Sequence, residues 1–172
     1  MTRKRKIVFI ISAFVLVAAW VCYKKTQEPL GSPLTAQEAS TLVERLVGAP
    51  IPEDATEIHG REVSFFTICI NVRFSCSEVQ FQTFLKASPR LLDKLDPNEK
   101  SLVQMQNNIP WWKPDSLTDT KGLETEWKDG THIVSCHILA GKEPEGNQLV
   151  VYMIFVLEAE TQRGRAQNAQ SD

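Results

Sequence analysis

The chain has 172 residues and a formal net charge of −2, with 21 acidic and 19 basic residues. The charge is unevenly distributed, because residues 26–172 hold all 21 acidic but only 13 of the basic residues, a net charge of −8. Such a domain would be repelled by phosphates, which argues against a nucleic-acid partner. Residues 26–172 are long enough for one compact domain.

The segment 7–23 is apolar and contains no charged residue, proline or glycine. As a helix it would span about 25 Å, at the short end of what crosses a bilayer core of about 30 Å. Four basic residues precede this segment directly and two follow it. Basic residues stay preferentially in the cytoplasm. We therefore expect residues 1–6 to be a cytoplasmic basic tail, residues 7–23 a single-pass transmembrane signal anchor, and the remainder extracytoplasmic.

Two other fates fit the same segment. The pattern also suits a cleavable signal peptide, with small residues at positions 17–19 before the cut. Trp20 and Tyr23 instead favour the outer interface of an uncleaved span, where aromatic residues gather. Lipid attachment at Cys22 would require small residues immediately before it, and bulky ones stand there. The sequence favours the anchor and leaves its cleavage open.

Residues 24–34 contain two prolines, a glycine and a serine, a composition typical of a stalk. Thr35 and Glu38 then have the spacing of a capping box, which predicts a helix over residues 35–48. A glycine and a proline end this helix.

The middle of the chain alternates between strand and helix patterns. Apolar residues at every second position predict a long strand over residues 64–74, preceded by a short strand over 55–59. A capping pattern that begins at Ser75 predicts a helix over 76–88. A second helix is predicted over 97–107, with proline at its first turn.

The last third of the domain has strand patterns. Asp129-Gly130 predicts a tight hairpin between strands at 125–128 and 131–139. The run 148–157 is apolar on both faces, as expected for a central strand.

These elements predict an α+β extracytoplasmic domain over residues 35–158. Its expected core is an antiparallel sheet of four or five strands with helices packed on one face, preceded by one N-terminal transmembrane helix. The polar residues 159–172 are expected to be a disordered tail.

Three short motifs occur in this domain. They are Ile51-Pro52-x-x-Ala55 before a strand, Arg73-Phe74 leading into a helix with Phe84-Leu85, and Pro110-Trp111-Trp112. In this combination residues 50–158 resemble small exported or membrane-anchored proteins of the bacterial envelope. No activity is attached to that group, so the resemblance implies an envelope location and no particular chemistry.

The sequence indicates no metal site, cofactor or recognisable catalytic motif. His132 and His137 stand five residues apart on one predicted strand, so they point to opposite faces. No cysteine or histidine pair has the spacing that zinc sites favour. Neither a nucleophile elbow nor a phosphate-binding glycine loop is present.

Trp111, Trp112 and Lys113 are the best candidates for a binding surface. Tryptophan offers a large apolar area with one polar group, and the flanking prolines stiffen the backbone. We expect one indole to enter the core and the other to face a partner. The leading function is therefore a membrane-anchored extracytoplasmic interaction protein that binds an envelope protein or glycan. The alternative is an anchored hydrolase of envelope polymers, which would require a histidine, a carboxylate and a serine or cysteine in one cleft.

Cys76 and Cys136 are a candidate disulfide pair. An exported domain lies where disulfides form. The two thiols could meet if the strand at 131–139 lay close to the strand at 64–74, because bridging requires Cα atoms within about 7 Å.

Overall fold

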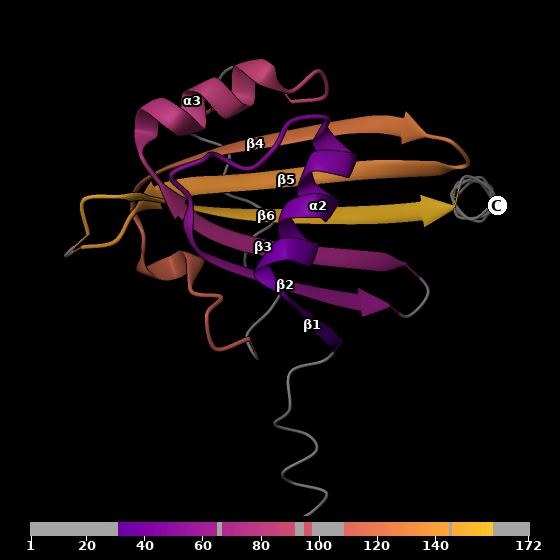
Figure 1. The fold of residues 1–172 in the computed structure, drawn as a ribbon, viewed down its shortest axis with the longest axis horizontal. Helices are drawn as coiled ribbons and strands as arrows, with labels where there is room; N and C mark the ends of the chain where they lie inside the picture. The colour runs from indigo at the N-terminus through magenta and orange to yellow at the C-terminus, as the bar shows by residue number, and fades with distance from the viewer. Residues whose placement is uncertain (1–30, 65–66, 92–94, 98–108, 145, 160–172) are drawn as a thin grey trace, which may run out of the picture. The chain divides into compact units, whose positions relative to one another are not determined.

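The computed structural model describes residues 31–64, 67–91, 95–97, 109–144 and 146–159. Its centre is a six-stranded sheet in which every neighbouring pair is antiparallel, in the order β1-β2-β3-β6-β5-β4 (Figure 1). The strands are β1 (Ser32–Leu34), β2 (Thr56–Ser64), β3 (Ile68–Cys76), β4 (Thr118–Asp129), β5 (His132–Lys142) and β6 (Leu149–Ala159). The helices are α2 (Ala36–Val47), α3 (Glu78–Ala87) and a 3-10 turn, η2 (Pro114–Ser116).

The predicted α+β class is wrong, because the described chain is mostly a six-stranded sheet with only two α-helices. The strand that the prediction missed is β1, which lies in the segment expected to be a stalk. Its composition resembles a linker, and only pairing with β2 makes it a strand. The predicted anchor 7–23, residues 98–107 of the predicted helix 97–107 and residues 160–172 of the predicted tail lie outside the described residues. Within the described ranges, no helix has the length and apolar character needed to cross a membrane.

Local sequence signals account well for the two helices. Thr35 Oγ1 accepts a hydrogen bond from the Glu38 amide at 3.2 Å, and the Glu38 carboxylate accepts from the Thr35 amide at 2.8 Å, which confirms the predicted capping box. Gly48 ends α2 in the left-handed conformation, with φ of 78°. The N-cap of α3 is Ser77 rather than the predicted Ser75, because β3 continues to the residue before it.

Both helices cover the same face of the sheet, as Figure 1 shows. The apolar stripe of α2 and that of α3 meet the inward-facing side chains of β3, β4, β5 and β6 in one buried cluster. Its largest fully buried members include Phe74, Phe81, Phe155, Leu46 and Leu85.

The opposite face carries a smaller apolar cluster. It consists of Ile109, Trp112, Leu139, Val150, Tyr152 and Ile154. The segment 109–117 contributes to this cluster, so it covers part of the face that the helices leave open. Because β6 is apolar on both faces and lies between β3 and β5, it is the central strand that the sequence predicts.

The two long strands on either side of the tight turn form the predicted hairpin. Asp129 pairs with His132, and Gly130 occupies the turn with φ of 59°. Residues 60–62, which separate the predicted strands at 55–59 and 64–74, are instead the middle of β2. Gly60 is needed there because a Cβ atom would lie 2.8 Å from the Cβ of Ala39, where α2 crosses the strand.

A β-bulge interrupts the pairing of β2 with β3. Thr56 pairs with Ser75 and His59 pairs with Arg73, so two residues of β2 oppose one residue of β3. The first bulged residue, Glu57, has φ of 51°, in the left-handed region that non-glycine residues seldom adopt.

A second bulge lies near the start of β4. Thr118 pairs with Lys142 and Lys121 pairs with Ala140, so again two residues oppose one. Asp119 in this bulge has φ of 53°, and it and Glu57 are the two non-glycine residues with positive φ in the described chain. Each bulge adds one residue and therefore turns the side chains beyond it to the other face of the sheet.

The two edge strands of the sheet are β1 and β4. β1 is only three residues long and contains Pro33. On the outer side of β4, the backbone of Asp96 forms an isolated antiparallel bridge with Gly122, through hydrogen bonds of 2.7 and 2.8 Å.

Candidate functional site

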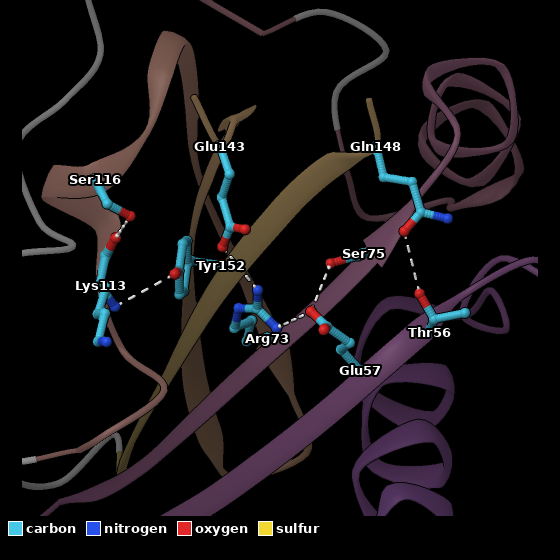
Figure 2. Close-up of polar contacts among 9 residues, drawn as sticks. All are labelled: Thr56, Glu57, Arg73, Ser75, Lys113, Ser116, Glu143, Gln148 and Tyr152. Atoms are coloured by element: carbon cyan, nitrogen blue, oxygen red, sulfur yellow. Dashed lines mark hydrogen bonds and ion pairs between the residues drawn. The ribbon is translucent and has the colours of Figure 1, made fainter. Parts of the chain in front are cut away.

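A buried arginine lies on the sheet face opposite the helices and binds two glutamates (Figure 2). Arg73 of β3 contacts Glu57 Oε2 at 2.8 Å and Glu143 Oε1 at 3.0 Å. Ser75 donates a further hydrogen bond of 3.4 Å to the Glu57 carboxylate. The bulge in β2 allows this contact, because it directs Glu57 to the same face as Arg73.

The three charged side chains differ strongly in exposure. The Arg73 side chain is 8% exposed, whereas those of Glu57 and Glu143 are 60% and 45% exposed. The hydrogen bond and charge of Arg73 hold the pKa of Glu57 below its ordinary value. Burial disfavours the Arg73 cation, but its interactions with Glu57 and Tyr152 outweigh that effect and raise the pKa of Arg73. Arg73 therefore favours the charged form of Glu57, and both carboxylates lie exposed beside a fixed cation.

A row of aromatic rings begins at this arginine. The Arg73 guanidinium lies 6.0 Å from the centre of the Tyr152 ring, and Tyr152 meets Trp112 edge to face at 4.9 Å. Trp112 contacts Trp111 at 5.6 Å, and Trp111 stacks on His59 at 5.5 Å. His59 is the strand partner of Arg73, so the contacts close into a ring.

We call this group the aromatic–arginine patch. It consists of His59, Trp111, Trp112, Tyr152 and Arg73, together with the two glutamates bound to Arg73. Further contacts fix the loop that supplies the tryptophans. The backbone amide of Lys113 donates to the Tyr152 hydroxyl at 3.3 Å, and Ser116 donates to the Lys113 carbonyl at 2.7 Å (Figure 2).

The structure places the three predicted binding residues side by side with different exposures. Trp112 is 6% exposed and belongs to the second apolar cluster, whereas Trp111 is only half-buried. The Lys113 side chain is exposed. One indole thus enters the core and its neighbour reaches the surface, while a binding role for either residue stays a prediction.

The structure does not bring the candidate disulfide pair together. Cys76 lies opposite Leu149 of β6 and Cys136 opposite Phe155, an offset of six residues, or about 20 Å along the sheet. Both thiols are free and fully buried in the larger core. Burial raises the pKa of Cys76 to about 12, with Asp54 adding to the effect, and burial also raises the pKa of Cys136.

The nearest approach to a hydrolytic arrangement lies on β4 and β5. His137 Nδ1 is 3.8 Å from Glu124, and Ser135 donates to Glu126 at 3.4 Å. Among the described residues no hydrogen bond connects this serine with the histidine, as a serine nucleophile and its base would require. In the same ranges, no group of three or more histidine, cysteine, aspartate or glutamate side chains could hold a metal ion.

A separate cavity of about 360 Å³ lies between α3 and the sheet, on the face that the helices cover. Its charged lining residues are Glu78, Asp119, Lys121 and Lys142. Its apolar lining residues are Phe81, Leu95, Ala140 and Leu149. None of these residues was predicted to belong to a site, because α3, three strands and the segment that holds Leu95 bring them together from distant parts of the chain.

Arg73, Glu57 and Tyr152 are members of the patch that the sequence did not reveal. Arg73 stands at a polar position of an alternating strand, as a solvent-facing residue would, so nothing in the sequence indicates that it is buried. The partners themselves depend on a bulge that strand periodicity does not reveal.

The fold and the site define a sheet-rich domain with a surface cluster of aromatic and paired charged residues. The sequence matches no protein-family model, and it has no significant similarity to a curated protein or to a solved structure. The resemblance to exported envelope proteins therefore stays a prediction.

Proposed function

We propose that this chain is a membrane-anchored interaction protein of the cell envelope that binds its partner through the aromatic–arginine patch. The observation that carries the proposal is the half-buried Trp111, held on both sides by rings in a row of contacts that ends at Arg73 and its two exposed carboxylates. Because these groups are already fixed by Arg73 and Tyr152, binding would cost little conformational entropy.

The chemistry of the patch suits a neutral glycan best among envelope components. An indole supplies apolar area, and exposed carboxylates accept hydrogen bonds from hydroxyl groups. The net charge of −8 over residues 26–172 would repel strongly anionic polymers. A polar segment of an envelope protein is the other partner that such a surface could hold.

We expect Trp111→Ala to weaken binding of the full chain to purified cell-wall glycan by about tenfold, because it removes the ring that faces the partner. Co-sedimentation with the insoluble glycan measures this effect. Trp111→Phe keeps a ring at the position and should retain most of the binding. Equal binding by the wild type and the alanine variant would rule out the patch as the glycan site. If the chain binds an envelope protein and no glycan, and Trp111→Ala abolishes that binding, the partner of the patch is a protein.

The anchored topology leads to an independent prediction. The excess of basic residues before residues 7–23 predicts that the C-terminus lies outside the cytoplasm. A reporter enzyme that is active only after export should therefore be active when it is fused to the C-terminus. Activity of a cytoplasm-specific reporter at the same site would contradict this orientation.

A further inference from the structure

The cavity beneath α3 is separated by the sheet from the aromatic–arginine patch. Its apolar lining residues belong to the core cluster under the helices, whereas Trp112 and Tyr152 belong to the cluster on the opposite face. Its volume of about 360 Å³ is at the small end of the range for small-molecule sites. Any ligand of this cavity is therefore independent of the partner proposed for the patch.

The bulge in β4 places Lys121 on the same face of the sheet as Lys142 of β5, and both exposed lysines line this cavity. Without the extra residue, Lys121 would point to the face that carries the patch. With it, Lys121 shares the face of Ala140, and Lys142 lies two residues further along the same face. The two lysines are thus diagonal neighbours, about 7–8 Å apart at the backbone. Gly141 permits the close approach of the bulged strand, since a Cβ atom there would lie 2.9 Å from the Thr118 carbonyl oxygen.

Two carboxylates balance this pair of cations. Glu78 reaches the cavity from the first turn of α3, and Asp119 occupies the strained bulge position beside Lys121. Asp119 has φ of 53°, in the left-handed region that aspartate adopts more readily than most residues. The side chains of all four charged residues form no hydrogen bond or ion pair with any other described residue, so their charges are available to a ligand.

We propose that this cavity binds a small zwitterion with an apolar side chain, either a free α-amino acid or a dipeptide. The carboxylate of the ligand lies between Lys121 and Lys142, and its ammonium group faces Glu78. The apolar side chain packs against Leu95 and Leu149, the half-buried members of the apolar lining. A simple anion would offer no cation to Glu78, and a simple cation would offer no anion to the two lysines. A zwitterion is the ligand class that satisfies both signs.

Titration calorimetry on the full chain with leucine, leucyl-leucine and two analogues tests this proposal. One analogue, 4-methylpentanoate, lacks the ammonium group, and the other, 3-methylbutylamine, lacks the carboxylate. We expect leucine or leucyl-leucine to bind and each analogue to bind at least about tenfold more weakly, because one set of charge-assisted hydrogen bonds is lost. Binding of an analogue as tightly as the zwitterions would overturn the assignment. No binding of either zwitterion at millimolar concentration would overturn it as well.

Matched variants locate the site. Lys142→Gln and Glu78→Gln should each weaken binding of the zwitterion about tenfold. Lys86→Gln in α3 and Glu44→Gln in α2 are the controls, because these exposed residues lie outside the cavity lining. An equal loss of zwitterion binding in the control variants would show that overall charge, and not this cavity, determines binding. Circular dichroism of each variant verifies that the fold is intact.

Discussion

Replacing Trp112 by alanine should lower the free energy of unfolding by about 3–5 kcal/mol, the usual cost of removing a buried aromatic side chain. Trp112 is 6% exposed and packs edge to face against Tyr152 at 4.9 Å. The remaining void would open the second apolar cluster, which is small and has few side chains that could move to fill it. Urea denaturation of the purified full chain, followed by circular dichroism, measures the change.

The neighbouring tryptophan provides the matched comparison. Trp111 is half-buried and its principal contact is the stack on His59, so Trp111→Ala should cost only about 1 kcal/mol. Trp112→Phe, which retains a ring against Tyr152, should lie between the two alanine variants. Equal destabilisation by Trp111→Ala and Trp112→Ala would show that the loop serves only to close the core.

Removing both glutamates that bind Arg73 should destabilise the protein more than removing Arg73 itself. In the double variant Glu57→Gln/Glu143→Gln the arginine stays buried without a counter-charge, which should cost about 2–3 kcal/mol. In Arg73→Met the glutamates are exposed enough to be hydrated, and the methionine fills the space of the arginine stem, so the cost should be about 1 kcal/mol. Thermal and urea unfolding of the two variants measure which of them is less stable.

The ion pairs of Arg73 also predict that the stability of the fold depends on pH. The folded-state pKa of Glu57 is lower than its ordinary value of 4.5, so its contribution to stability is present above that value. This contribution is lost as the pH falls through the lowered pKa of the folded state. The double glutamine variant should lose less stability than the wild type over this acid range. Glu44→Gln, an exposed position on α2, serves as the control. A steeper acid dependence in the double variant than in the wild type would contradict this assignment.

Local patterns predicted the elements whose signals lie within a few neighbouring residues. The capping box at Thr35, the tight turn at Gly130 and the doubly apolar strand β6 all depend on short-range chemistry that is visible in the sequence. Trp112 is buried because a large apolar side chain next to a small core tends to pack into that core.

The elements that the prediction missed depend on contacts between distant residues. β1 is a strand only because β2 offers it hydrogen bonds, and β2 passes through Gly60 because α2 crosses above it. The bulges at Glu57 and Asp119 leave no periodic signal, since one extra residue breaks the alternation on which strand prediction depends. The ion pairs of Arg73 and the charged lining of the cavity beneath α3 both depend on these bulges. Strand periodicity therefore did not reveal either site.

The short β1 and the bridge between Asp96 and Gly122 also affect how the domain can associate with a second chain. An open sheet edge is a template on which a second chain can add a strand, the first step of aggregation. Pro33 has no N–H to donate to an incoming strand, and Asp96 already occupies the outer hydrogen-bonding groups of Gly122. Each edge of the sheet therefore carries a local obstacle to edge-to-edge pairing, at Pro33 on β1 and at Gly122 on β4.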